Sequence, residues 1–179
     1  SFLAARRLGK PIVCLALAVF GRTWLEMKGQ LVGRAAALWE RYVLTRPYDR
    51  LIFLSEHNRQ LGMDFGVAAA RSVVIDPAVD VHEYGPAPEK EDVVLFSAKL
   101  EARKGVPELL DVARALPDVR FQVLGWGPDE DKLRRCALPN LEFAGFERGE
   151  RFRQRFARAR IFFLPSRAEG FPLVLLYAM

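Results

Sequence analysis

Short apolar segments alternate with longer segments of helical periodicity along almost the whole chain, and this alternation limits the possible folds. The apolar segments span residues 12–19, 50–54, 72–75, 93–96, 120–124, 141–144 and 161–164. Helices are expected over residues 24–44, 56–61, 106–115, 129–136 and 149–159, and a last one begins near residue 172. Short buried strands separated by helices form β-α-β units with parallel strands and a sheet covered on both faces. The chain is therefore predicted to belong to the α/β class.

One segment interrupts this alternation. Residues 76–89 hold three prolines, one glycine and several acids without any periodicity, which predicts a linker. The chain then consists of two α/β units, one before and one after this segment. A length of 179 residues suits one ordinary domain or two small or incomplete ones. Because the chain ends inside an apolar run, we expect it to be a piece of a longer protein.

Composition excludes several classes of protein. With 51% hydrophobic and 27% charged residues, the chain can bury a core and is not disordered. Cys14 and Cys136 lie far apart, and neither histidine has a second ligand at metal-binding spacing, so we expect no disulfide framework and no bound metal. This cysteine usage predicts a cytoplasmic protein. The formal net charge of +5 favours anionic substrates or peripheral contact with a membrane.

The loop after the strand at 93–96 carries two lysines at a position where α/β sheets bind ligands. Lys99 leaves the end of the strand, and Lys104 stands at the entrance of the next helix. Ligands bind beyond the carboxyl ends of parallel strands, where helix N-termini offer free N–H groups. The two cations can thus converge on one phosphate. The alternative is that both are ordinary solvated surface lysines.

The loop after the strand at 161–164 has the features of a second anion site. Gly170 permits a close approach of the backbone, and Pro172 suits the first position of a helix. Glu169 can accept hydrogen bonds from hydroxyl groups such as those of a sugar. Its alternative role is to stabilise the helix dipole. The main-chain amides expected to face the ligand are those of Phe171, Leu173 and Val174.

Three other features have simpler interpretations. Gly125 and Gly127 lack the third glycine of a dinucleotide motif and predict only a tight turn. The arginines between residues 148 and 160 could bind RNA, but Phe152 and Phe156 recur at helical spacing and favour an amphipathic helix with a solvated basic face. The aromatic helix at 24–44 could contact a membrane or a partner, although its apolar stripe is more typical of core packing.

The two anion sites together resemble the donor half of retaining glycosyltransferases with the GT-B architecture, of the family 4 type. Most of the chain takes part in the resemblance, and its most specific stretch is the start of the E-x7-E motif at Glu169. The stretches that carry it are YDRLIFLSEHNRQL (48–61), VVIDPAVDVHEY (73–84), LFSAKLEARKG (95–105), FQVLGWGP (121–128), NLEFAG (140–145) and FLPSRAEGFPLVLLYAM (163–179).

This resemblance implies a GT-B-type chain with Rossmann-like sheets, in which both lobes are incomplete. Residues 1–85 would be part of the N-terminal acceptor lobe, and residues 86–179 part of the C-terminal lobe that binds a nucleotide sugar. The implied activity is transfer of a hexose from a nucleoside diphosphate sugar with retention of configuration. Neither a metal nor a cofactor is needed. The acceptor, a glycan, a lipid or a small molecule, is left open, and no nucleic acid is involved.

The resemblance also implies roles for individual residues. Lys99 and Lys104 would bind the donor diphosphate, and Glu169 would act as the catalytic residue that contacts the donor sugar. Tyr177 takes the place of the second glutamate, which holds the ribose hydroxyls, and a phenol can bond only one of them. The main-chain amides that would hold phosphate are those of Gly170, Phe171 and Leu173.

Departures from the family pattern leave a second hypothesis open. Leu17 and Ala18 stand where the family often has a histidine followed by aspartate or glycine, and neither can transfer a proton. Together with Tyr177 they favour a catalytically degenerate binding or scaffold module. In either case the chain by itself is expected to be inactive. RNA binding through the arginine-rich face is a third hypothesis.

Overall fold

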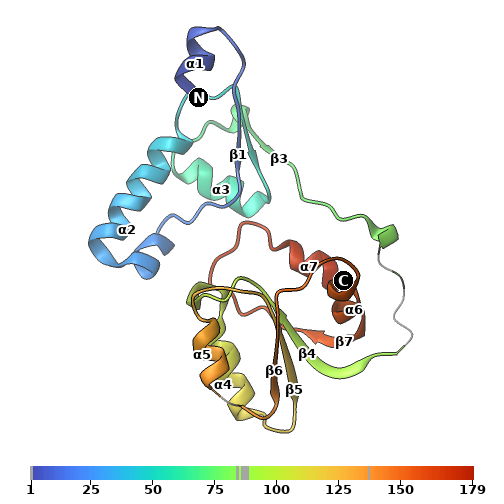
Figure 1. The fold of residues 1–179 in the computed structure, drawn as a ribbon. Helices are drawn as coiled ribbons and strands as arrows, with labels where there is room; N and C mark the ends of the chain where they lie inside the picture. The colour runs from blue at the N-terminus through green and yellow to red at the C-terminus, as the bar shows by residue number, and fades with distance from the viewer. Residues whose placement is uncertain (1, 84, 86–88, 137) are drawn as a thin grey trace. The chain divides into compact units, whose positions relative to one another are not determined.

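The chain forms two compact units (Figure 1). The computed structural model describes residues 2–83, 85, 89–136 and 138–179. The first unit comprises Ser1–Pro77 with Ala168–Phe171, and the second comprises Ala78–Arg167 with Pro172–Met179. Residues 84 and 86–88 of the predicted linker lie outside the described residues.

The first unit contains a sheet of three parallel strands in the order β1-β2-β3. The strands are β1 (Val13–Ala16), β2 (Arg50–Phe53) and β3 (Ser72–Val74), and the helices are α1 (Phe2–Arg7), α2 (Thr23–Leu44), α3 (Glu56–Asp64) and the 3-10 helix η1 (Ala69–Arg71). Leu51 and Phe53 of the central strand are fully buried in the core, where Ala16 and Leu44 join them. Ser55 begins α3 as its N-cap, because its hydroxyl accepts a hydrogen bond from the Asn58 amide.

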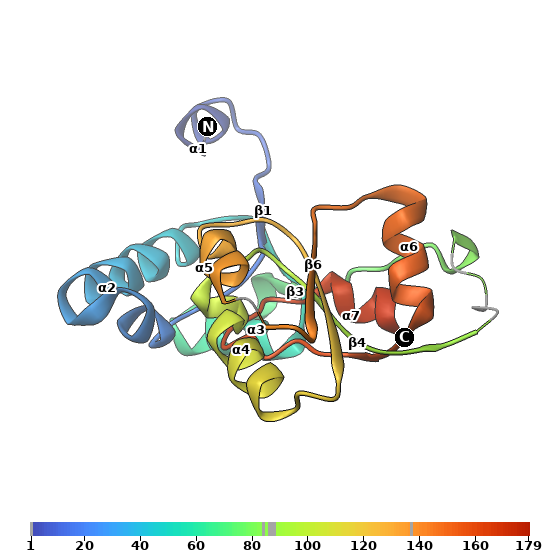
Figure 2. The same ribbon diagram turned by 60° about the horizontal axis from the view of Figure 1, so that its bottom comes forward.

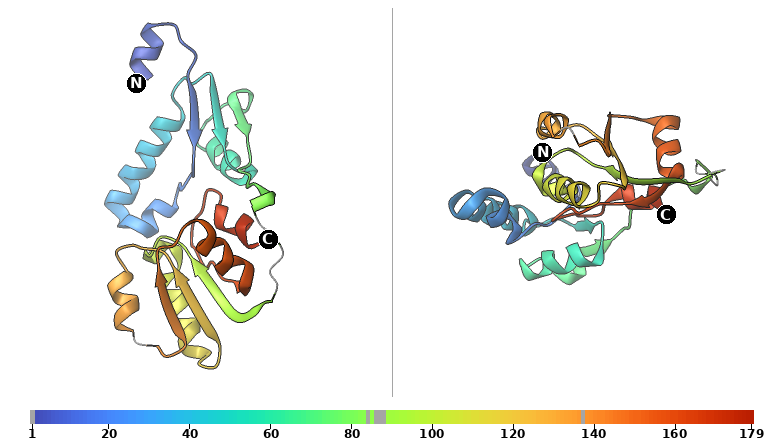
Figure 3. Two further views of the ribbon diagram at one scale, coloured as in Figure 1. Left: turned by 45° about the vertical axis from the view of Figure 1, so that its right-hand side comes forward. Right: turned by 90° about the horizontal axis from the view of Figure 1, so that it is seen from below.

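The second unit is built on a parallel sheet of four strands in the order β6-β5-β4-β7. The strands are β4 (Glu91–Ser97), β5 (Arg120–Leu124), β6 (Leu141–Gly145) and β7 (Ala159–Phe162), and the helices are α4 (Val106–Ala115), α5 (Glu130–Arg135), α6 (Gly149–Arg158) and α7 (Leu173–Ala178), with 3-10 helices η2 (Val81–Glu83) and η3 (Ala102–Lys104). Helices α4 and α5 lie on one face of this sheet, and α6 and α7 lie on the other (Figures 2 and 3).

Strand β4 lies inside this sheet and is buried on both faces. Val94 and Phe96 pack with the apolar side chains of α4 and α5, whereas Leu95 packs with Phe156 of α6. Successive side chains of a strand point to opposite faces, so an unbroken apolar run is what a covered parallel strand requires. The prediction of a covered parallel sheet is confirmed for this unit.

The segment at residues 12–19 does not form the buried strand that its composition predicts. Its strand β1 ends at Ala16, and the Val13 and Leu15 side chains are more than half exposed. The reason lies in the strand order, because among the described residues β1 pairs only with β2 and so forms an edge of the sheet. Helix α1, which precedes it, was not expected from the sequence either.

The core packing expected for the stripe on α2 is also wrong. Leu31, Leu38, Trp39 and Tyr42 are all more than half exposed. Gly29 adopts φ 74° and ψ 176° and interrupts the helix. The first turn of α2, before this break, lies so close to Gly33 that a Cβ atom there would overlap the Trp24 carbonyl oxygen. This packing turns the face of α2 that carries small residues toward the unit.

None of the described helices has both the length and the apolar character needed to cross a bilayer.

Candidate functional site

Two loops of the second unit lie side by side because their strands, β4 and β7, are neighbours in the sheet. The Arg167 amide donates a hydrogen bond to the Arg103 carbonyl oxygen at 2.9 Å. Gly105, at φ 87°, lies so close to Pro165 that a Cβ atom would overlap the Pro165 carbonyl oxygen. The Arg167 guanidinium donates two hydrogen bonds to Glu108 at 2.7 and 2.9 Å, and these bonds lower the pKa of Glu108. The segments that directly follow β4 and β7 thus share a main-chain contact.

Lys99 is part of an ion-pair cluster at the end of β4. Its Nζ lies 3.1 Å from Glu101 Oε2, and Arg103 approaches Glu101 Oε1 at 2.7 Å. Burial raises the pKa of Glu101, but the hydrogen bonds from Lys99 and Arg103 outweigh this effect and hold the pKa below its usual value. The cluster therefore carries a net positive charge at neutral pH. Lys104 closes the 3-10 turn through its amide, which donates to the Glu101 carbonyl oxygen at 2.9 Å.

A cavity of about 300 Å³ lies at the carboxyl ends of β4 and β5. Lys99 contributes to its wall, but Lys104 does not line it. Its size is at the lower end of the range of small-molecule sites, and its position agrees with the general rule for ligands of parallel α/β sheets. The lining residues are Ser97, Ala98, Lys99, Leu124, Gly125, Trp126, Phe146, Glu147, Phe152 and Val174.

Gly125 and Gly127 do more than form the tight turn predicted for them. A Cβ atom on Gly125, whose φ is 138°, would overlap the Ala98 carbonyl oxygen, and one on Gly127 would overlap the backbone of Leu100. The Leu100 amide donates to the Trp126 carbonyl oxygen at 2.9 Å. The two glycines thus let the loop after β5 lie directly against the loop after β4, which shapes one wall of the cavity. The sequence feature that indicates this close approach is a glycine immediately after a buried strand.

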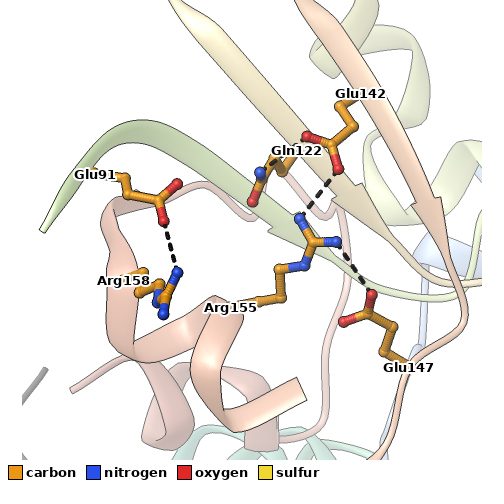
Figure 4. Close-up of polar contacts among 6 residues, drawn as sticks. All are labelled: Glu91, Gln122, Glu142, Glu147, Arg155 and Arg158. Carbon is orange, nitrogen blue, oxygen red and sulfur yellow. Dashed lines mark hydrogen bonds and ion pairs between the residues drawn. The ribbon is translucent and has the colours of Figure 1, made fainter. Parts of the chain in front are cut away.

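Glu147 is a cavity residue that the sequence analysis missed. Its Oε1 accepts a hydrogen bond from Arg155 at 3.2 Å, and its Oε2 is buried without a hydrogen-bond partner among the described residues. Arg155 also donates to Glu142 at 3.1 Å, and Gln122 donates to the same carboxylate at 3.0 Å (Figure 4). A buried acceptor without a partner is unfavourable, so Oε2 offers a bonding position to a ligand.

The arginines of α6 are not the simple solvated face predicted for them. Phe156 is buried, as expected for an amphipathic helix, but Arg155 is also largely covered. Burial lowers the pKa of Arg155, and the bonds to Glu147 and Glu142 outweigh this effect and raise it. Arg158 pairs with Glu91 at 3.4 Å (Figure 4). These carboxylates neutralise part of the basic charge on which RNA binding would depend.

The residues of the second predicted anion site are divided between the two units. Glu169, Gly170 and Phe171 are counted with the first unit, and Leu173 and Tyr177 with the second. Glu169 is partly buried, and α7 begins at Leu173, directly after Pro172.

Gly170 has well-defined contacts within the first unit. Its carbonyl oxygen accepts hydrogen bonds from Asn58 Nδ2 at 2.9 Å and from Ser55 Oγ at 3.2 Å. The Asn58 side chain is fully buried and also accepts from the Val19 amide at 2.6 Å. A Cβ atom on Gly170 would overlap the Leu17 carbonyl oxygen, so the position requires glycine.

The family to which the chain belongs follows from a match to a family model. A family model described as glycosyl transferases group 1 matches residues 80–179, which is more than half of the chain. The chain belongs to this family. No curated protein matches.

Solved structures that resemble this group 1 chain have the GT-B fold. HepE from Anabaena, in complex with UDP and glucose, is 18% identical with a TM-score of 0.74, and the match covers 98% of this chain and 52% of HepE. Sucrose-phosphate synthase from Thermosynechococcus elongatus is 16% identical with a TM-score of 0.77, over 99% and 50% of the two chains. TarM from S. aureus is 15% identical with a TM-score of 0.75, over 94% and 34%. The chain thus spans between about a third and about half of these proteins.

Tyr177, the residue that the resemblance aligns with the second motif glutamate, is packed among aromatic side chains. Its ring meets Phe152 edge-on at 5.5 Å between centroids and lies 6.1 Å from Phe156. This packing attaches α7 to α6 and gives the tyrosine a structural role. Among the described residues, no group of three metal-ligating side chains is found.

Removing the guanidinium of Arg155 should destabilise the second unit. Replacement of Arg155 by Gln leaves the largely buried carboxylate of Glu147 and the half-exposed carboxylate of Glu142 without this cation, so we expect a loss of about 1–3 kcal/mol in unfolding free energy. Arg151→Gln, an exposed change on the same helix, should stay within about 0.5 kcal/mol of the parent. Urea unfolding followed by circular dichroism measures both. Equal stabilities of the two variants would show that the ion pairs of Arg155 with Glu147 and Glu142 do not stabilise the unit.

Proposed function

We propose that this chain is part of a glycosyltransferase that transfers a hexose from a nucleoside diphosphate sugar with retention of configuration. The observation that carries the proposal is the cavity at the ends of β4 and β5, with Lys99 in its wall, in a chain of the group 1 family. Residues 86–179 are the proposed donor-binding lobe, and residues 1–85 the proposed part of the acceptor lobe. The acceptor, a glycan, a lipid or a small molecule, is not assigned.

Lys99 and Lys104 are the proposed ligands of the donor diphosphate. Negative charge develops on the diphosphate as the bond to the sugar breaks, and cations held in place before the reaction stabilise it. Glu101 supports this role because it holds Lys99 at the end of β4 while Arg103 balances its charge. A lysine acts on phosphate as a point charge and does not impose the two-pronged geometry of arginine.

The cavity is the proposed site of the nucleoside. HepE has been crystallised with UDP, and we propose the same nucleotide here. Trp126 and Phe146 stand at the cavity with more than half of their surfaces exposed, so either ring can stack on a base. Glu147 Oε2 can accept a hydrogen bond from the nucleoside. Tyr177 is proposed to contribute at most one further hydrogen bond to the ribose, because its ring is packed against α6.

The donor sugar is proposed to contact Glu169, which follows the strand next to β4. Its carboxylate can accept hydrogen bonds from sugar hydroxyls and is the proposed catalytic group. The main-chain amides of Gly170, Phe171 and Leu173 are proposed to hold phosphate oxygens, as the backbone near a helix start commonly does. No step of this proposal requires a metal ion.

Loss of the Lys104 ammonium should weaken nucleotide binding. For Lys104→Ala we expect the dissociation constant of UDP to rise about tenfold, because one charge contact to the diphosphate is lost. Lys132→Ala, an exposed change on α5, serves as the matched control and should leave affinity unchanged. Titration calorimetry on the full-length natural protein measures both, with uridine as a ligand without phosphate. Equal UDP affinities for the two variants would remove Lys104 from the site.

A catalytically degenerate binding or scaffold module is the second candidate. Leu17 and Ala18 cannot transfer protons, and the Tyr177 ring packs against Phe152 and Phe156. Such a module would bind the nucleotide sugar without cleaving it. Binding experiments alone do not separate the two candidates, whereas donor hydrolysis does.

A further inference from the structure

A second cavity of the second unit lies between α6 and the face of β4 and β5 that this helix covers. Its volume of about 290 Å³ is close to that of the cavity beside Lys99, and Glu147 forms part of the wall of both. Apart from Val93 and Ala159, every described residue that lines it is polar or charged. The covered face of a parallel sheet is normally apolar, so the fold alone does not account for this lining.

Three arginines of one helix line this second cavity, which we call the arginine cavity. Arg151, Arg155 and Arg158 follow one another at spacings of four and three residues, so they share one side of α6. Figure 4 shows Arg155 and Arg158 reaching from α6 toward the strands. Like charges at this spacing repel one another, so negative charge close to them is favourable.

The carboxylates of the protein offset only part of this positive charge. Arg155 and Arg158 pair with glutamates at distances between 3.1 and 3.4 Å. Arg151 is exposed, and within the part of the chain that the structure describes it has no carboxylate partner. The arginine cavity can therefore accept one further anionic group beside Arg151.

Gln122, on β5, brings an acceptor without a partner to the same cavity. The residue is only 8% exposed. Its amide nitrogen donates to Glu142 at 3.0 Å, and its amide oxygen points away from that carboxylate (Figure 4). No described residue donates a hydrogen bond to this oxygen. Because a buried acceptor without a partner is unfavourable, the oxygen favours a ligand that carries a donor such as a hydroxyl group.

We propose that the arginine cavity binds a phosphate monoester of a small sugar or polyol. The phosphate pairs with Arg151 and Arg158, because the guanidinium fork matches two phosphate oxygens, and a hydroxyl of the same molecule donates to the Gln122 amide oxygen. The volume is at the lower end of the range of small-molecule sites and suits such a small ligand. The site is separate from the proposed nucleotide site, and the proposal does not depend on the proposed glycosyltransferase function.

Titration calorimetry of the full-length natural protein with ribose 5-phosphate tests the site. The titration is carried out with and without saturating UDP, which blocks the proposed nucleotide site. We expect single-site binding of ribose 5-phosphate under both conditions. Inorganic phosphate, which lacks the ribose hydroxyls, should bind about tenfold more weakly or less, and ribose alone should not bind detectably. A protein that does not bind UDP can be titrated in the same way, so failure of the proposed function leaves this test intact.

Substitution of the arginines locates the binding. Arg151→Gln combined with Arg158→Gln should weaken ribose 5-phosphate binding about tenfold or more, because two charged contacts to the phosphate are lost. Arg134→Gln combined with Arg135→Gln removes the same charge from exposed positions of α5 and should have no effect. The circular dichroism spectra of both variants should match that of the parent, because all four side chains are exposed.

Several results would overturn the proposal. They are a parent protein that does not bind ribose 5-phosphate, equal affinities for this ester and inorganic phosphate, and binding that the Arg151→Gln, Arg158→Gln variant retains. The same arginines could instead contact the backbone of RNA. A single-stranded RNA oligonucleotide that binds more tightly than ribose 5-phosphate, and that the same two substitutions release, would assign them to RNA and contradict the proposed site.

Discussion

Replacement of Gly125 by alanine is expected to destabilise the second unit by about 3–5 kcal/mol, as a buried steric conflict does. The new Cβ atom would overlap the Ala98 carbonyl oxygen, and the φ of 138° is one that side-chain-bearing residues rarely adopt. Relief would require the loop after β5 to move away from the loop after β4. Thermal and urea unfolding of the chain measure the loss, and the cavity should bind nucleotide more weakly even where the variant remains folded.

Gly145→Ala separates the steric overlap from the backbone strain as causes of this loss of stability. Gly145 also has a positive φ, of 78°, but a Cβ atom there has no neighbour within 4 Å. We expect it to cost about 1–2 kcal/mol from backbone strain alone. If the two variants lose the same stability, then the contact between the loops does not require glycine at position 125.

Replacement of Glu169 by alanine should lower donor hydrolysis by about a hundredfold or more, because a group that acts only in the transition state affects the rate more than the affinity. The measurement is release of UDP from UDP-glucose by the full-length natural protein. We expect the affinity for UDP itself, measured by calorimetry, to change little. Asp118→Ala, at an exposed acid of the second unit, is the matched control.

This experiment also decides between the two proposed functions. Release of UDP by both the parent and the Glu169→Ala variant at no more than the rate without protein would contradict the enzyme and support the degenerate binding module. Rapid release by both proteins would instead show that Glu169 is not the catalytic residue.

Most of the fold could be predicted from the sequence because local patterns and tertiary structure agree. The run at residues 93–96 is apolar at every position, and β4 is covered on both of its faces. Residues 12–19 have a similar composition, yet within the part of the chain that the structure describes β1 has a single neighbour, β2. Composition reports how apolar a strand is, whereas the number of its neighbours depends on strand order, which is a property of the whole sheet.

The candidate site could be predicted only in part, for a related reason. Lys99 stands two residues after the end of a buried strand, so its position at the cavity follows from the general geometry of parallel sheets. Glu147 and Arg155 lie eight residues apart in the sequence, and only the packing of α6 on the sheet brings them together. The tight fit of Gly125 against Ala98 likewise depends on two loops from different strands.

The exposure of Trp126 and Phe146 has a consequence for how such a protein can change over time. Neither residue belongs to a buried cluster, so substitutions there should cost little folding stability, whereas changes at Gly125 or Arg155 should be costly. Natural or laboratory selection for a different nucleotide can therefore change Trp126 and Phe146 while Gly125, which the packing of the cavity wall requires, is kept. Libraries randomised at these two aromatic positions should contain mostly folded proteins.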